Sequence, residues 1–249
     1  MLKSYPSFLI LLLTISSLVF SQNNHITIGQ NYYQNGEYQK AINTFEENLA
    51  KEGFNYESLW RLSQAQCEFG NSLNDEDKKE ELYKSALENA KKATELNKQG
   101  DMGFAYFAIS SGRMAIFKGG KEKLQLSKDV KSYAEKAIQL NSKNDLAYHT
   151  LARWNREVTN LSWMKRMAIK VIYDGLPEAS FEKAVELFQR AISIDPDYNN
   201  HHLELAETYK LMGQKDLAKK ELEIASSLEP KSAKEKVYKQ IATEKLAKF

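Results

Sequence analysis

An interval of 34 residues recurs in the C-terminal half of this chain and constrains its fold more than any other feature. The interval separates Ala184 from Ala218, and Pro196 from Pro230. A repeat of this length is typical of solenoids, in which each unit buries its apolar face only against its neighbours. Eleven glycines and four prolines in 249 residues leave few tight turns, which argues against a β-sandwich or barrel. The sequence therefore predicts an all-α protein built from stacked helix pairs.

The repeat is clean at both ends of the chain, where the spacing matches the tetratricopeptide repeat (TPR), a helix-turn-helix unit. The matching positions are Ile28, Gly29, Tyr32, Gly36, Ala41 and Phe45 in the first copy, and Leu205, Ala206, Tyr209, Gly213, Ala218 and Leu222 in the last. We expect Gly29 and Ala206 where two antiparallel helices approach closely, with Phe45 filling the space beside Gly29. Gly36 and Gly213 should end the first helix of their units.

Three altered copies lie between the clean ones, each lengthened between its two helices. About eleven residues are inserted after Gly70, so that the second helix of this unit is expected to begin near Ser85. The third copy is stretched around the Gly119–Gly120 pair. The fourth contains about twenty additional residues, including WMKRMAIKVIYDGLP, which predict an extra short helix ended by Gly175 and Pro177.

The predicted organisation is one helical repeat domain behind a targeting segment. Residues 22–249 should form a TPR-like α-solenoid of about five helix-turn-helix repeats with insertions. The repeats are expected at 22–55, 56–99, 101–142, 145–197 and 199–232. A last helix at 232–248 should cap the open end of the stack through Val237, Tyr238, Ile241 and Leu246.

Residues 1–21 have the features of a cleaved secretory signal. A positive start precedes an apolar run of about thirteen residues, Phe8–Phe20, which is too short to span a bilayer of about 30 Å as a helix. The small residues Val19 and Ser21 suit signal peptidase, and the polar Gln22 follows. We therefore expect an exported protein, periplasmic or secreted. The alternative is an anchor that is not cleaved.

The altered repeats resemble the regulator of microtubule dynamics family, whose members have a tetratricopeptide-like domain at the C-terminal end. The segments that carry the resemblance are SALENAKKATELN, YAEKAIQLNSKNDLAYHTLARW, LSWMKRMA and LPEASFEKAVELFQRAISIDPDYNNHHLELAETY. The resemblance extends from about His25 to the end of the chain. It implies association with microtubules and, from one member, lipid binding by the repeat domain. An exported protein would not meet cytosolic tubulin.

The residue types that support catalysis or metal binding occur in no recognised arrangement. None of the four histidines belongs to an HExxH motif, and the adjacent His201 and His202 would point about 100° apart on a helix. The only cysteine, Cys67, has an acidic neighbour, Glu68, which raises the pKa of a thiol. The segment Lys118–Lys121, KGGK, lacks the serine or threonine of a phosphate-binding loop. We expect no enzyme, no metal and no cofactor.

The concave face of the predicted solenoid is the expected binding surface. The exposed stripe of the first helices supplies the candidate residues, which are Tyr33, Trp60, Gln64, Phe107, Met114, His149, Arg153, Arg156, Glu207 and Lys210. The stripe changes from aromatic to basic, which suits an apolar chain at one end and an acidic group at the other. Arg153 and Arg156 are the strongest candidates, because they are difficult to bury without partners. In the alternative, Trp60, Phe107 and Met114 are core residues of a closed solenoid.

The sequence thus predicts a non-catalytic, monomeric scaffold that binds a peptide or protein partner in its concave groove. The alternative is a carrier of anionic lipid. An apolar tunnel would favour lipid, and a shallow polar groove would favour peptide. The net charge of +2 does not indicate nucleic-acid binding. The basic, apolar segment Trp163–Tyr173 is expected either to pack on the stack or to lie on a membrane.

Overall fold

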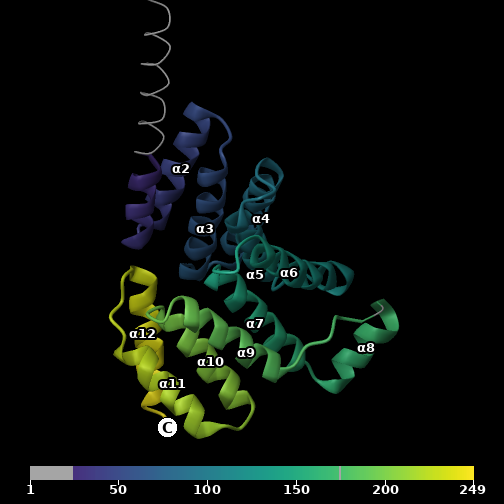
Figure 1. Ribbon diagram of the computed structural model, residues 1–249. Helices are drawn as coiled ribbons and strands as arrows, with labels where there is room; N and C mark the ends of the chain where they lie inside the picture. Colours follow the sequence, from purple (N-terminus) through teal and green to yellow (C-terminus); the bar gives the residue numbers. More distant parts are fainter. Residues whose placement is uncertain (1–24, 174) are drawn as a thin grey trace, which may run out of the picture.

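The computed structural model describes residues 25–173 and 175–249. The expected signal, residues 1–21, and its alternative as an anchor lie outside the described residues. Within these ranges every regular element is a helix, and the helices pack in successive pairs (Figure 1). The predicted all-α, TPR-like solenoid of five repeats with insertions is therefore confirmed.

The first pair consists of residues 25–34 and α2 (Tyr38–Glu52). The next four pairs are α3 (Tyr56–Ser72) with α4 (Glu76–Leu96), α5 (Asp101–Met114) with α6 (Gly120–Leu140), α7 (Asp145–Thr159) with α9 (Phe181–Ile194), and α10 (Asn199–Leu211) with α11 (Lys215–Ser227). The inserted helix α8 (Trp163–Tyr173) lies within the fourth pair, and α12 (Ala233–Leu246) follows the fifth.

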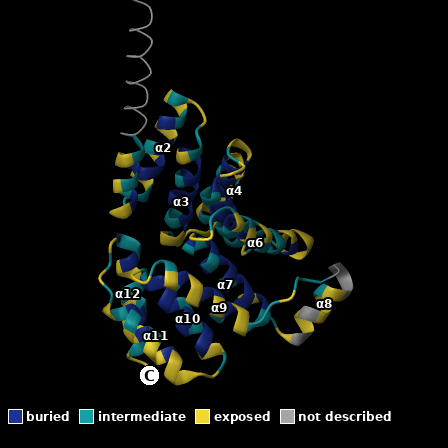
Figure 2. Cartoon of the chain, viewed as in Figure 1, coloured by how far each residue is buried: buried dark blue, intermediate teal, exposed yellow. Residues whose placement is uncertain are grey.

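Small residues let the two helices of each pair approach closely. A Cβ atom on Gly29 would lie only 2.5 Å from the ring of Phe45, which is fully buried. Gly36 and Gly213 have φ values of 80° and 76°, a left-handed conformation that suits glycine at a helix end. Each second helix carries an alanine that is at most 1% exposed, namely Ala41, Ala86, Ala134, Ala184 and Ala218. Figure 2 shows buried positions concentrated where paired helices face each other.

The insertion after Gly70 lengthens a helix instead of forming a loop. α4 begins at Glu76, so the expectation of a start near Ser85 was wrong. The Asp75 side chain caps the helix by accepting a hydrogen bond from the backbone N–H of Lys78 (3.1 Å), and acidic residues in the first turn suit the helix dipole. The Lys-rich stretch of the third copy is likewise helical from Gly120. α4 and α6 each have 21 residues, against 15 in α2.

The last helix packs on the fifth pair, as predicted for a cap. Tyr238, Ile241 and Leu246 of α12 pack against a buried cluster of α10 and α11. Val237 was expected on the same face, but it is 54% exposed. Successive helical residues point about 100° apart, so the face that buries Ala242 turns Val237 toward solvent.

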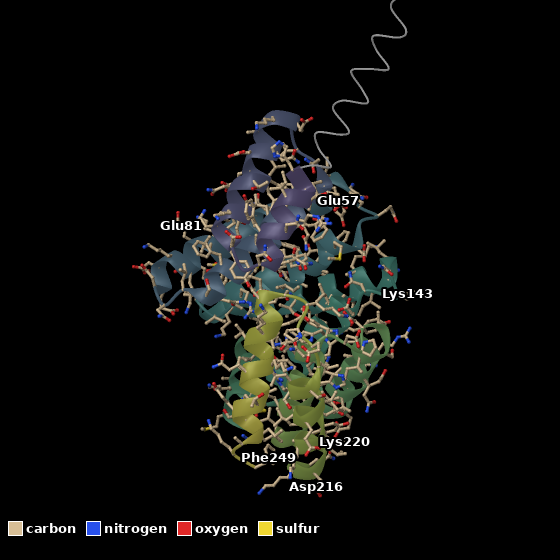
Figure 3. All side chains as sticks on the ribbon, turned by 90° about the vertical axis from the view of Figure 1, so that its left-hand side faces the viewer. Glu57, Glu81, Lys143, Asp216, Lys220 and Phe249 are labelled. Carbon is tan, nitrogen blue, oxygen red and sulfur yellow. The ribbon has the colours of Figure 1, made fainter. Side chains whose placement is uncertain are left out.

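The same helix also reaches the first pair and closes the stack on itself. A Cβ atom on Gly36 would lie 2.8 Å from the Cβ of Ala233, the first residue of α12. Figures 1 and 3 both place the start of α12 next to the first helices. The two ends of the solenoid therefore meet, which narrows the concave face to a partly open cavity.

Candidate ligand-binding cavity

A partly open cavity of about 620 Å³ lies on the inner side of the stack. Residues of α3, α5, α6, α7, α8, α10 and α12 line it, so that both the central pairs and the closing helix contribute. This volume lies within the range of about 300–1,000 Å³ that is usual for small-molecule sites.

One part of the lining is apolar and comes from α5 to α8 and the loop after α8. Its members are Ala108, Ile109, Ala115, Ile116, Leu124, Val130, Leu146, Trp154, Val158, Leu161, Ala168, Ile169 and Leu176. The indole Nε1 of Trp154 donates a hydrogen bond to the Oγ of Ser127 (3.1 Å), so its polar atom is satisfied within the protein. This wall therefore offers contacts to hydrocarbon with little demand for hydrogen bonds from a ligand.

The other part of the lining is polar and includes Lys234 and Tyr238 from α12. The Lys234 ammonium lies 5.6 Å from the centre of the Tyr33 ring and 5.2 Å from that of Tyr198, within the range of cation–π attraction. Glu68 of α3 carries the nearby negative charge that attracts both Lys234 and Arg113. Helices from opposite ends of the chain thus meet in this polar region.

Cations outnumber acids in the cavity lining. The five basic residues are Arg113, Lys123, Arg153, Lys165 and Lys234, and the two acidic ones are Glu68 and Glu157. Within the described part of the chain, neither Lys123 nor Lys165 forms a salt bridge. The site therefore combines an apolar wall with a surplus of positive charge, which suits a ligand with an apolar body and an acidic group.

The structure places most of the predicted groove residues in packed interiors. Seven of the ten are at most 8% exposed, and these are Tyr33, Trp60, Gln64, Phe107, Met114, His149 and Arg156. Of the ten, only His149 and Arg153 line the cavity. Glu207 pairs with Lys245 at 2.9 Å, and Lys210 is exposed.

The aromatic candidates pack against other rings instead of facing an open groove. Trp60 stacks on Tyr106, with 5.7 Å between ring centres, and Phe107 meets Tyr133 edge-on at 4.3 Å. Gln64 donates a hydrogen bond to the hydroxyl of Tyr106. The alternative, in which Trp60, Phe107 and Met114 belong to the core, therefore describes their surroundings.

Arg156 is buried because it has internal partners. Its Nη1 lies 2.6 Å from a carboxylate oxygen of Glu204 on α10, and its Nη2 lies 3.0 Å from Glu157. Burial alone would raise the pKa of Glu204, but Arg153 and Arg156 hold that pKa below its usual range. The argument that Arg156 needs a ligand was therefore wrong, since the next helix pair supplies its countercharge. Arg153, with Nε 3.6 Å from Glu204 and its side chain 37% exposed, keeps access to the cavity.

His149 belongs to a buried polar chain at the cavity wall. Its Nδ1 lies 2.9 Å from Nδ1 of His201, whose Nε2 lies 3.1 Å from Asp145. Burial lowers the pKa of His149 well below its usual value, so its ring is neutral near pH 7. His202 points elsewhere and meets Glu221 at 2.7 Å, as the divergence of adjacent helical residues predicts.

Within the two described ranges, no group of three or more metal-binding side chains comes together. No helix in those ranges has the length and apolarity needed to cross a membrane.

Sequence reasoning missed several lining residues, including Glu68, Arg113, Trp154, Tyr198 and Lys234. Trp154 and Arg113 each lie one position away from a predicted groove residue on the same helix. A shift of the expected stripe by one residue toward the C-terminus would have found Trp154, whereas Arg113 needs a shift of one residue in the opposite direction. Lys234 has no such local signal, because only the closure of the stack brings it to the cavity.

Comparisons with known proteins match nearly the whole described chain. The family described as regulator of microtubule dynamics protein 1-3 matches residues 26–249. Regulator of microtubule dynamics protein 1 from Bos taurus is 32% identical over 188 residues, which cover 75% of this chain and 59% of the relative. Regulator of microtubule dynamics protein 3 from Xenopus laevis is 26% identical over 213 residues, 85% of this chain and 45% of the relative. The chain thus spans about half of the length of these relatives.

The fold has a counterpart among solved structures. A thermophilic TPR protein from Thermus thermophilus superposes with a TM-score of 0.66 at 19% identity, over 90% of this chain and 99% of that one. At this level of identity the likeness concerns the fold alone.

Proposed function

The chain belongs to the regulator of microtubule dynamics protein 1-3 family, and we propose that it is a non-catalytic binding protein whose cavity holds an anionic amphiphile. The observation that carries the proposal is the composition of the cavity lining, which joins an apolar wall to five basic side chains. An acyl chain with a carboxylate or phosphate head group has the matching chemistry.

Each part of such a ligand finds a partner in the lining. Burial of a methylene group contributes about 0.8 kcal/mol, so an acyl chain against α5, α6 and α7 supplies most of the affinity. An acidic head group gains charge-assisted hydrogen bonds from Arg153 or Arg113. His149 is neutral and adds no charge to the site, so the arginines and lysines supply the attraction for the head group.

A peptide or protein partner is the second candidate, supported by the extended concave surface that solenoids offer. A bound peptide backbone requires hydrogen-bond partners of its own. Two polar side chains of this face are engaged internally, since the Gln64 amide donates to Tyr106 and Arg156 pairs with Glu204. A long peptide would also displace α12. These features favour the amphiphile over the peptide.

Native mass spectrometry of delipidated protein incubated with oleic acid tests the proposal. We expect one oleate per monomeric chain and little uptake of oleyl alcohol, which lacks the charge. Arg153→Glu should weaken oleate binding at least tenfold, since a charge-assisted hydrogen bond contributes about 1.5–3 kcal/mol. The matched control is Arg190→Glu, which changes an exposed arginine on α9.

A second variant fills the cavity without touching its charges. Gly112 lines the cavity within α5, and among the described residues outside its own helix backbone the one atom within 4 Å of a Cβ built on it is a methyl carbon of Val130 at 3.5 Å. Gly112→Leu should therefore fold, since leucine favours helix, and should abolish oleate uptake. Oleate uptake that is unchanged in both variants would contradict the proposal. Capture of an acidic peptide in place of oleate would support the second candidate.

Export to the periplasm or medium is a further part of the proposal, based on the pattern of residues 1–21. Fractionation of cells that express the full chain tests it. Recovery of unprocessed protein in the cytosol would overturn export. Regulation of microtubules, the activity in the relatives' names, would then become the function to test. Co-pelleting with assembled tubulin would then test that activity.

A further inference from the structure

The inserted helix α8 presents an apolar stripe that none of the other described segments covers. Met164 is 73% exposed, Met167 is 42% exposed and Ala168 is also exposed. Their spacing of three and four residues places them on one face of the helix. Figure 1 shows α8 at the edge of the molecule, projecting from the stacked pairs. Of the two alternatives for α8, packing of its apolar side on the stack therefore does not apply to these residues.

Positive charge borders this stripe on both sides. Lys165 and Lys170 are exposed and flank the methionines around the helix. The sequence of α8 contains three basic residues and no acidic one. Exposed apolar residues bordered by lysines are typical of helices that lie in the headgroup region of anionic membranes, with the lysine stems extending toward the phosphates.

The side of α8 next to this stripe belongs to the cavity. Lys165 and Ile169 line the 620 Å³ cavity, as do Ala168 at the edge of the stripe and Leu176 in the loop that follows. Ile169 and Leu176 also line a second cavity of about 660 Å³, between α7, α8 and the start of α9. A surface that binds α8 would therefore lie directly at the entrance to the apolar wall.

We propose that α8 docks the protein on an anionic phospholipid bilayer and places the mouth of the cavity at the membrane surface. The methionine stripe enters the boundary between head groups and acyl chains, and Lys165 and Lys170 contact lipid phosphates. Docking depends on α8 alone, whereas the passage of lipid from the bilayer into the cavity rests on the proposed function.

Co-sedimentation with phosphatidylcholine vesicles, with and without phosphatidylglycerol, tests docking of the full chain. The readout is the gain in binding from neutral to anionic vesicles, because any contribution of the apolar N-terminal run is common to all variants. Each basic side chain near an anionic surface contributes about 1 kcal/mol, so Lys165→Glu with Lys170→Glu should reduce this gain roughly 30-fold. High salt should reduce it as well.

The methionines are tested by Met164→Glu with Met167→Glu, a change outside the cavity lining. This variant should lose vesicle binding and keep the uptake of oleate. The matched controls are Leu211→Glu with Leu217→Glu, which are 45% and 44% exposed, and Lys215→Glu with Lys220→Glu. Figure 3 shows Lys220 at the far tip of the molecule from the first helices. Both controls should bind vesicles as the parent does.

The outcomes separate docking from the proposed function. Vesicle binding that is absent, equal for neutral and anionic lipid, or unchanged in both α8 variants would overturn docking, whatever the uptake of oleate. Vesicle binding that is lost only in the α8 variants would support docking even in a protein that takes up no oleate. In that case the proposed cavity ligand alone would be wrong.

Discussion

The first and fifth helix pairs keep the tetratricopeptide spacing closely, whereas the three pairs between them carry insertions, and inserted residues line the cavity. Gly120, Lys123 and Leu124 come from the lengthened start of α6, and Lys165 and Ile169 come from α8. The regular end pairs instead supply contacts that close the stack. Extra residues within a repeat can therefore create a binding cavity while the stacking of the pairs is conserved.

The sharpest test of this comparison is the same leucine-to-alanine substitution made in a regular pair and in an altered pair. Leu205 in the fifth pair is 1% exposed within the core, and Leu124 in the third lines the cavity. Leu205→Ala should cost about 4 kcal/mol of unfolding free energy, and Leu124→Ala about 2 kcal/mol, because Leu124 already borders empty space. Urea unfolding measures both. Equal losses would show that the altered pairs are packed as tightly as the regular ones.

The junction between an altered and a regular pair depends on Glu204. Glu204→Gln leaves the buried Arg156 with only the exposed Glu157 as countercharge and should cost about 3 kcal/mol. The control Glu186→Gln removes an exposed ion pair with Lys183 and should cost less than about 1 kcal/mol. Similar losses in the two variants would mean that the arginine is solvated in the folded protein.

The polar chain through His149 makes the same junction sensitive to pH. Burial keeps this histidine neutral in the folded protein, whereas the unfolded chain binds a proton below about pH 6.5. Stability is therefore complete above that pH and falls as the pH decreases toward the lowered pKa of the folded state, by up to about 1.4 kcal/mol per unit. His149→Asn should flatten this decrease of stability with falling pH, and His25→Asn, a change of a half-buried histidine, should keep it. A slope that persists in His149→Asn would assign the effect to another group.

The closing contact should show the smallest energetic effect. Lys234→Met removes the cation between the Tyr33 and Tyr198 rings and should cost about 1 kcal/mol, against no loss for the exposed Lys236→Met. Spin labels on cysteines at Gln39 and Gln240 should report a broader distance distribution in Lys234→Met. The native Cys67 is buried, and burial raises the pKa of its thiol to about 12, so it should stay unlabelled. An unchanged distribution would show that other contacts hold the ends together.

The sequence was sufficient for the fold because its determinants are local. Gly29, Phe45 and the buried alanines determine how one helix lies on the next, and the 34-residue interval reveals them. The true start of α4 could also have been predicted from local sequence, since Asp75 followed by Glu76 is a helix-capping pattern. The insertion of about eleven residues after Gly70 was placed before this helix, whereas the helix includes part of it.

The site was harder to predict because it depends on curvature. Small rotations between successive pairs decide whether a stripe faces a groove or a neighbouring helix, and no short sequence pattern encodes their sum. Trp60 and Phe107 therefore lie in the core, although their spacing also fits a groove. Arg156 was misjudged for a related reason, because its partner Glu204 lies on a helix from the next repeat.

The closure by α12 also determines when the cavity is completed during synthesis of the chain. Pairs in an open stack fold through contacts with their neighbours, in any order, as they emerge. Here the polar end of the cavity has no wall until Lys234 and Tyr238 meet helices that were synthesised much earlier. Contacts between distant parts of a chain form late. A nascent chain can therefore be well folded through most of its repeats and still lack the polar end of the cavity, so that the proposed binding becomes possible only when α12 is complete.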